Sequence, residues 1–262
     1  MAWVTSIDQM KQEVVLNAPP QRIISLVPSQ TELLFDLGLG ERVVGVTKFC
    51  VHPEHARKSK TIIGGTKQFD LNRINSLKPD LIIGNKEENY PEGIEALRER
   101  YPVWMSDIID VEDALVMIGE IARITDCAAK GETLLSEINA SLNSLPIFQP
   151  RRALYLMWYD PWMGAASGTF IHTLIEKSGL VNVLANVERY PVLTDDQIKS
   201  LRPEIVMLSS EPFPFAEKHL SKLKLQLPEA NCVFVDGEYF SWYGSRLQRV
   251  APYFRTLQAF LS

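Results

Sequence analysis

The stretch "SLKPDLIIG" occupies Ser76–Gly84, and the chain reads "SLRPEIVML" at Ser200–Leu208. Each copy contains a short apolar run, Leu81–Ile83 in the first and Ile205–Leu208 in the second. Apolar runs of this length, bounded by turn residues, are typical of strands that are buried on both faces of a sheet. The repetition therefore predicts two equivalent buried strands far apart in the sequence.

A helix is predicted directly before each of these strands. Asp70 opens the first copy and Thr194 opens the second, and both are residue types that cap helix N-termini by accepting a backbone N–H. Gln197 stands three residues after Thr194, which is capping-box spacing. Each helix should end before Pro79 or Pro203, because the residue before a proline is disfavoured in the α region. Each copy thus reads as a helix, a tight turn and a parallel strand, as expected for two similar α/β lobes.

The remaining pattern places one long helical stretch between the two copies. Apolar residues recur at helical spacing over 111–145, with a break at 124–126 where Asp126 should cap the second helix. Ser29 and Glu32 have capping-box spacing for an earlier helix, and Gly38 suits its C-terminal end. We predict an N-terminal lobe over 1–125, a bridging helix over 126–146 and a C-terminal lobe over 147–262.

Composition excludes several classes of protein. The chain has 262 residues and a net charge of −5, and Lys and Arg do not cluster as they do in nucleic-acid-binding proteins. No apolar run reaches the length of a membrane span. The first sixteen residues lack the pattern of a secretory signal, so the chain is either cytoplasmic or has lost its signal. Three cysteines cannot all pair with one another, so a monomer keeps a free thiol.

The sequence resembles the substrate-binding proteins of ABC importers for cobalamin, haem and iron–siderophore complexes, also called helical-backbone metal receptors. The resemblance rests on "PPQRIISLVPSQTELLFDLGLGERVVGVT", "LNRINSLKPDLIIG" and "SLRPEIVML", and covers the chain from Pro20 onward. "SLVPSQTEL" and the Cys-His-Pro loop bring the cobalamin branch closest. The resemblance implies two Rossmann-like lobes with mainly parallel sheets, joined by one long backbone helix, with ligand held between the lobes.

Strand chemistry also indicates where a ligand should bind. In open parallel sheets ligands bind beyond the carboxyl ends of the strands. Two loops expected there are rich in aromatic residues, which suit a bulky corrinoid or other metal chelate. Resemblance carries ligand contact onto Phe49, Trp158 and Trp242, and Arg246 could hold an anionic ligand group. The full set of predicted ligand-binding residues is Ser29, Gln30, Phe49, Lys67, Asn85, Trp158, Tyr159, Trp162, Phe240, Trp242, Tyr243 and Arg246.

Two further sets of residues are candidates for metal binding and for docking. Cys50, His52 and His55 are weak candidates for a direct metal site, since their spacing matches no strong zinc pattern. Family members dock onto their permease through one acidic residue on each lobe, and Asp196 and Asn72 stand at that position here. Asp196 fits the pattern, whereas the amide of Asn72 carries no charge.

The expected function is capture of a metal complex for an ABC importer, without catalysis and without a catalytic cofactor. Its partners would be the ligand and an inner-membrane permease, with no nucleic acid, and the protein would be a monomer in the periplasm or cell envelope. The alternative is a cytoplasmic binder, or a chelatase-like enzyme of cobalamin or tetrapyrrole metabolism. No arrangement of nucleophile and base favours the enzyme.

Overall fold

A computed structural model describes residues 3–261. The contacts between residues divide the chain into two compact units. The first unit comprises Met1–Ile108, Glu112–Glu137 and Gly244–Arg246, and the second comprises Ile109–Val111, Ile138–Tyr243 and Leu247–Ser262. Among the described residues, no helix is both long enough and apolar enough to cross a membrane.

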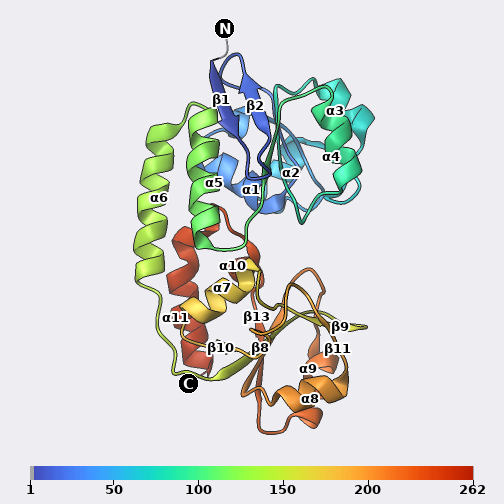
Figure 1. Cartoon of the computed structure of the whole chain (residues 1–262), viewed down its shortest axis with the longest axis vertical. Helices are drawn as coiled ribbons and strands as arrows, with labels where there is room; N and C mark the ends of the chain where they lie inside the picture. Colours follow the sequence, from blue (N-terminus) through green and yellow to red (C-terminus); the bar gives the residue numbers. More distant parts are fainter. Residues whose placement is uncertain (1–2, 262) are drawn as a thin grey trace. The chain divides into compact units, whose positions relative to one another are not determined.

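The first unit is built on a five-stranded parallel sheet with the order β5-β4-β3-β6-β7. Its strands are all short, and the three in the middle are largely buried. Figure 1 draws the helices and strands of the chain with their labels. They run over Ile23–Ser25 (β3), Val43–Val46 (β4), Thr61–Ile62 (β5), Leu81–Asn85 (β6) and Val103–Ser106 (β7). The helical segments of this unit are Pro28–Asp36 (α1), Gly40–Arg42 (η1), Ala56–Ser59 (α2), Leu71–Leu77 (α3), Pro91–Arg98 (α4) and Val111–Ile124 (α5).

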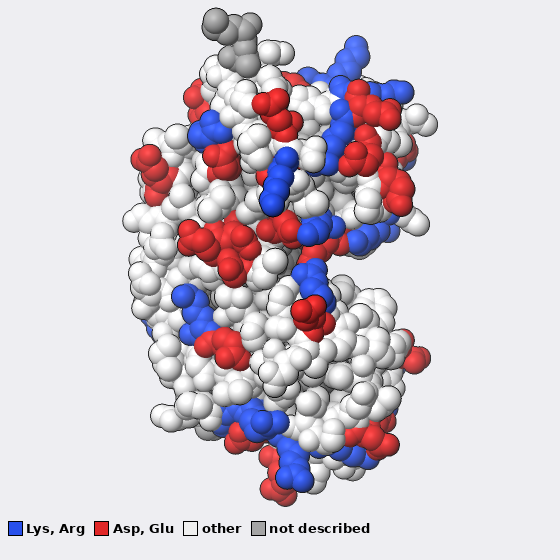
Figure 2. All heavy atoms as spheres, in the orientation of Figure 1, with Lys and Arg blue, Asp and Glu red and all other residues white. Residues whose placement is uncertain are grey.

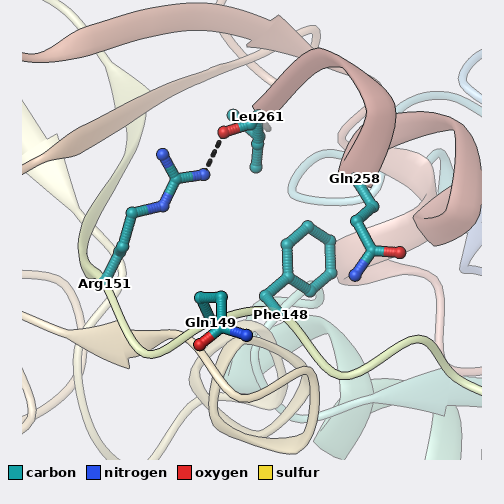
Figure 3. A pocket seen from close by; sticks show the side chains of 5 residues that line it. All are labelled: Phe148, Gln149, Arg151, Gln258 and Leu261. Carbon is teal, nitrogen blue, oxygen red and sulfur yellow. Dashed lines mark hydrogen bonds between the residues drawn. The ribbon is translucent and has the colours of Figure 1, made fainter.

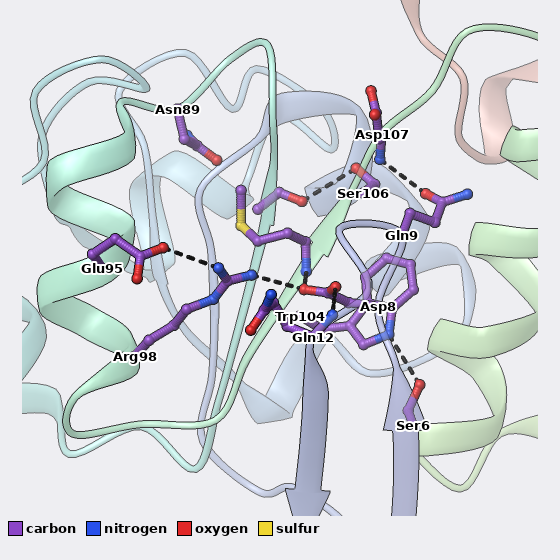
Figure 4. A network of polar contacts seen from close by, with 12 residues as sticks. Ser6, Asp8, Gln9, Gln12, Asn89, Glu95, Arg98, Trp104, Ser106 and Asp107 are labelled. Carbon is purple, nitrogen blue, oxygen red and sulfur yellow. Dashed lines mark hydrogen bonds and ion pairs between the residues drawn. The ribbon is translucent and has the colours of Figure 1, made fainter.

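A β-hairpin precedes this sheet, with antiparallel strands Val4–Ile7 (β1) and Glu13–Leu16 (β2). Asp8, buried at the turn, accepts hydrogen bonds from the backbone N–H of Gln12 and Met105 and pairs with Arg98 on α4 at 2.8 Å. Figure 4 shows this network and the neighbouring bond from the Trp104 indole to Ser6. The hairpin is therefore attached to the first unit by buried polar contacts.

The second unit contains a six-stranded mixed sheet. Strands β8, β12 and β13 are parallel to one another, β10 pairs in parallel with β8, and β9 and β11 are antiparallel. Their bounds are Arg152–Trp158 (β8), Trp162–Gly164 (β9), Val181–Asn182 (β10), Val192–Leu193 (β11), Ile205–Ser209 (β12) and Asn231–Val235 (β13). The helical segments are Phe170–Lys177 (α7), Asp195–Leu201 (α8), Glu217–Gln226 (α9), Glu238–Ser241 (α10), Ser245–Arg249 (η2) and Val250–Leu261 (α11).

Helix α6 (Ala128–Asn143) carries the chain from the first unit into the second, because the division falls between Glu137 and Ile138. The α/β class with two lobes predicted from the sequence is confirmed. The predicted lobe boundaries, after residue 125 and before residue 147, follow the ends of the predicted bridging helix. The two compact units are instead defined by contacts between residues, so the predicted boundaries remain a proposal. Asp126 takes a φ of +61° after α5, so its backbone ends that helix in the left-handed region instead of capping α6 as predicted.

The repeated segments fold as predicted. Asp70 accepts hydrogen bonds from the N–H groups of Asn72 and Arg73, and Thr194 forms a complete capping box with Gln197. β6 and β12 follow, each fully buried and each in the middle of its sheet. The two units therefore share a helix–turn–strand element that places β6 and β12 in equivalent positions.

Helix α1 begins differently from the sequence prediction. Its N-cap is Val27, with no side-chain cap, and Pro28 occupies the first turn. Ser29 and Glu32 lie inside the helix and are buried, so the predicted capping box between them is wrong. Proline at the first helical position has no N–H to satisfy and a fixed φ that suits the helix, which explains the earlier start. Gly38 takes a φ of +79° at the other end, as predicted.

Candidate ligand-binding site

Phe49 and Lys48 follow β4 at the carboxyl edge of the first sheet. The Phe49 ring is 50% exposed, and the Lys48 ammonium lies over it at 5.0 Å from the ring centroid. Gly65 lies against both side chains, since a Cβ at that position would be 3.4 Å from the Phe49 ring and 3.5 Å from Lys48. Phe49 is thus an exposed aromatic surface available to a ligand, with a cation beside it.

Lys67 and Asn85 also lie near this edge but have different surroundings. Lys67 is exposed, and its ammonium donates to the carbonyl of Glu87. Asn85 is buried at the end of β6, where its side-chain oxygen accepts from the N–H groups of Glu87 and Glu88. Asn85 therefore shapes the turn that presents the Glu87 carbonyl to Lys67, and its own side chain is committed to the protein.

Ser29 and Gln30 are buried in the first turn of α1. The Gln30 amide donates to Ser106 Oγ at 2.7 Å and to the Gly84 carbonyl at 3.3 Å, which joins α1 to the ends of β6 and β7. The Ser29 hydroxyl, the Gln30 side-chain oxygen and the Ser245 hydroxyl are buried without a hydrogen-bond partner in the protein.

Arg246 forms a buried ion pair with Glu32. Its guanidinium donates from Nε at 3.0 Å and from Nη2 at 2.8 Å to the two carboxylate oxygens, although 214 residues separate the pair. Both side chains are less than 10% exposed. Burial raises the pKa of Glu32, and the arginine opposes that shift. The arginine predicted to hold a ligand anion thus already holds a protein carboxylate.

The second unit carries an aromatic cluster at the carboxyl edge of its sheet, which we define as Trp158, Tyr159, Trp162, Phe213 and Phe215. Trp158 ends β8, and the two phenylalanines follow β12, its parallel neighbour, so the topology brings these loops to one edge. Consecutive rings lie in contact: Trp158 on Phe213 at 5.5 Å, Phe213 on Phe215 at 4.9 Å, and Tyr159 on Trp162 at 4.5 Å.

The members of the aromatic cluster differ in exposure. Trp158 is 40% exposed, whereas Trp162 is only 4% exposed and packs in the core of the unit. Trp162 belongs to strand β9, not to the loop predicted from the sequence, because the chain turns back after Pro161. Phe213 and Phe215 were missed among the predicted site residues, although the apolar "FPF" in the loop that follows a buried strand was the available signal. Trp158 is therefore the exposed member of this cluster, and the half-buried Phe213 is in ring contact with it.

His219 lies behind the aromatic cluster. Its ring centroid is 4.8 Å from that of Tyr159 and 5.2 Å from that of Phe213, and its Nδ1 accepts from the Ala216 N–H at 2.9 Å. Burial lowers its pKa, and the nearby Lys218 adds to this shift. The neutral imidazole, at the start of α9, packs against the rings of Tyr159 and Phe213.

Three of the aromatic residues that are predicted from the sequence to lie in a ligand-binding loop are buried instead: Phe240, Trp242 and Tyr243. Phe240 is fully buried in α10, and Trp242 and Tyr243 are each 6% exposed. The Trp242 indole and the Ser241 hydroxyl both donate to the same oxygen of Glu211, at 2.9 and 2.7 Å. Burial raises the pKa of Glu211, with Glu238 and Asp236 adding to the shift. Glu211, which the sequence did not single out, fixes the Trp242 ring.

The weak metal candidates do not come together. Cys50 is fully buried, with its Sγ 3.1 Å from the Thr31 hydroxyl and 3.3 Å from that of Thr47. His55 packs edge-on against Phe35. Within residues 3–261, no group of three or more His, Cys, Asp or Glu side chains is placed to hold a metal ion.

The two predicted docking residues lie in the first turns of α3 and α8. The Asp196 side chain is 95% exposed and only 3.9 Å from Lys199. Asn72 is exposed too, and Asp70 before it is committed to its own helix and to Arg73 at 3.3 Å. On the face drawn in Figure 2, acidic and basic side chains are interspersed rather than gathered by sign.

A separate pocket of about 350 Å³ lies at the other end of the second sheet. Figure 3 shows its lining, which is Phe148, Gln149, Arg151, Gln258 and Leu261. Arg151 directly precedes β8, so the pocket lies at the amino end of that strand. Because ligands of such sheets bind at the carboxyl ends, this pocket is not the ligand site we consider.

Comparison with known proteins agrees with this architecture. A family model described as periplasmic binding protein matches residues 23–227. The chain is 26% identical over 199 residues to the vitamin B12-binding protein of Vibrio parahaemolyticus, covering 74% of this chain and 72% of that one. It is 25% identical to the uncharacterized ABC transporter substrate-binding lipoprotein YvrC of Bacillus subtilis, covering 78% of this chain and 68% of that one.

Solved structures share the fold at lower identity. The apo periplasmic heme-binding protein RhuT from Roseiflexus sp. RS-1 superposes with a TM-score of 0.78 at 22% identity, covering 92% of this chain and 99% of that one. The vitamin B12-binding protein BtuF of Vibrio cholerae gives a TM-score of 0.74 at 20% identity, covering 93% and 97%. The resemblance to helical-backbone metal receptors is thereby confirmed, and the chain belongs to the periplasmic binding protein family.

Proposed function

We propose that this chain is a substrate-binding protein that captures a metal complex and delivers it to an ABC importer. A corrinoid of the cobalamin type is the first candidate, ahead of haem and iron–siderophore complexes. The protein acts as a monomer in the periplasm or cell envelope and carries out no catalysis. The relatives found are binding proteins, so the chelatase-like alternative is not favoured.

The observation that carries this proposal is the exposed edge of the aromatic cluster. Trp158 and Phe213 present ring surface at the carboxyl ends of β8 and β12, the edge where open parallel sheets bind ligands. Rigid rings supply a large contact area for the apolar face of a flat macrocycle. The first unit offers Phe49 and the lysines Lys48 and Lys67 at the corresponding edge, which suits polar or anionic substituents.

Delivery to a permease is supported by the surface of the second unit. Asp196 is almost fully exposed in the first turn of α8, and a carboxylate is stabilised there by the helix dipole. An exposed carboxylate of this kind can pair with an arginine of a partner protein. We propose Asp196 as the principal docking residue, with Asn72 at the equivalent place in the first unit.

The proposal predicts a direct binding result. Titrating the protein with cyanocobalamin, hemin and ferric ferrichrome while following tryptophan fluorescence should show saturable binding of one of them. Trp158→Ala should weaken that binding roughly 10-fold to 100-fold, the effect of losing about 1.5–3 kcal/mol of buried aromatic contact.

The matched control is Trp3→Ala. Trp3 is 38% exposed, close to the exposure of Trp158, but it precedes the hairpin of the first unit. Its removal should leave the affinity unchanged. Failure of all three probes to bind, or an equal loss in both variants, would contradict the proposed site.

A further inference from the structure

Asp195 connects the start of α8 to the interior of the second unit. One carboxylate oxygen accepts from the Trp162 indole at 2.7 Å, and the other accepts from Gln226 at 2.8 Å and pairs with Lys222 at 3.1 Å. Although partial burial opposes it, these hydrogen bonds hold the pKa of Asp195 below its ordinary value. A charged acceptor shared by three donors from two other elements fixes the position of the helix start.

Two of these donors contact the aromatic cluster: Trp162 is a member of it, and Lys222 lies over two of its rings. Trp162 contacts Tyr159 edge to face and stacks on Phe215 at 6.1 Å. The Lys222 ammonium lies 5.4 Å from the ring centroids of both Tyr159 and Trp162. An unbroken series of contacts therefore leads from the exposed Trp158 through Phe213, Phe215 and Trp162 to Asp195. The next residue is the exposed Asp196.

The equivalent helix in the first unit lacks this connection. Leu71 occupies the place of Asp195 in α3, and its side chain has no polar group. Asp70 before it caps only its own helix, through the N–H groups of Asn72 and Arg73. The link between helix start and aromatic rings is thus specific to the repeat that also carries the acidic docking residue.

We infer that Asp195 is a positioning residue that couples the aromatic cluster to the start of α8, so that a ligand seated on Trp158 and Phe213 alters the order of the turn bearing Asp196. The inference rests on the proposed function, since it needs a ligand on the cluster. The inference adds to the proposed function a physical route, contained in the second unit, by which ligand binding affects the docking surface. Ligand-dependent order in a local segment is a free-energy coupling between two sites.

The test is hydrogen exchange at the amides of 195–199 in the full chain, with and without cyanocobalamin or hemin. Bound probe should slow exchange there about 5-fold or more in the unaltered protein, the lower end of typical coupling. Asp195→Asn removes the charge that holds Lys222, and Gln226→Leu deletes the amide donor from α9. Both variants should bind the probe, yet show little probe-dependent change at 195–199.

The matched control is Glu120→Gln in the first unit, where the carboxylate likewise accepts from another element, at Ser6, and pairs with Arg123. It should keep the full response at α8. A response in Asp195→Asn and Gln226→Leu equal to that of the unaltered chain would overturn the inference while leaving the proposed function intact. Absence of binding of cyanocobalamin, hemin and ferric ferrichrome in every protein would instead refute the proposed function.

Discussion

Glu32 and Arg246 form a buried ion pair with two hydrogen bonds in the first unit. Removing one partner of a buried ion pair leaves an uncompensated charge, so Arg246→Ala should lower the free energy of unfolding by about 3–5 kcal/mol. The exposed pair Lys58–Glu54, with side chains 73% and 85% exposed, supplies the control. Lys58→Ala should cost about 0–1 kcal/mol. Urea unfolding measures both, and a loss in Arg246→Ala as small as in the control would contradict the interpretation.

This pair also shows why part of the site was beyond prediction from sequence. Exposed residues such as Phe49 and Trp158 could be singled out, because the family resemblance implies ligand contact there and both lie at carboxyl ends of strands. The sequence does not reveal that Arg246 meets Glu32, or that Trp242 meets Glu211, because such partners are set by tertiary packing over long separations. The buried positions of Gln30 and Asn85 have the same cause. Whether the predicted residues contact ligand remains a prediction.

At the scale of elements, the two copies of the repeat end their helices in an unusual conformation. Lys78 and Arg202, each directly before a proline, take φ values of +46° and +45°. The prolines were expected only to exclude these residues from the right-handed α region, and the left-handed conformation meets that expectation. Left-handed backbone costs a non-glycine residue about 1–2 kcal/mol.

Glycine at these positions should therefore be tolerated or stabilising. Arg202→Gly and Lys78→Gly relieve the left-handed strain. Glycine also raises the entropy of the unfolded chain, which lowers the free energy of unfolding by about 0.5–1 kcal/mol, so we expect a net gain in that free energy of up to about 1 kcal/mol. Lys78→Ala is the control, since it removes the exposed side chain and keeps the strain. Thermal unfolding should rank glycine above alanine at position 78. The reverse order would show that the lysine side chain matters more than the backbone.

The elements themselves were largely predictable, and the exceptions have physical reasons. Caps located α3 and α8, and short apolar runs located β6 and β12, because these segments carry strong local signals. Strand β9 and helix α10 were read as loops, since each is short and follows proline or glycine. The N-terminal hairpin was also missed. It is held by Asp8 through contacts with 98 and 105, which no local pattern reveals.

At the scale of the whole molecule, the duplicated α/β plan is preserved in fold but not in surface charge. Both units present the start of a short helix, α3 or α8, beside an equivalent central strand. The second unit offers an exposed carboxylate at Asp196 there, and the first unit offers the amide of Asn72. If docking to the permease uses both helix starts, its electrostatic contribution is asymmetric and comes mainly from the second unit.

This difference in charge can be tested with one substitution at each of the two equivalent helix starts. Asp196→Ala should weaken association with the cognate permease at low salt, and Asn72→Glu should strengthen it, because each changes one charge at equivalent positions. An exposed ion pair contributes only about 0–1 kcal/mol, so each change should alter the affinity by no more than about 5-fold. Glu229→Ala, which removes an exposed charge outside both helix starts, is the control and should have no effect. Raising the salt concentration should reduce both effects, since exposed charges are screened. If neither variant differs from the control, Asp196 and Asn72 serve only the helix starts, and the permease must recognise another surface of the protein.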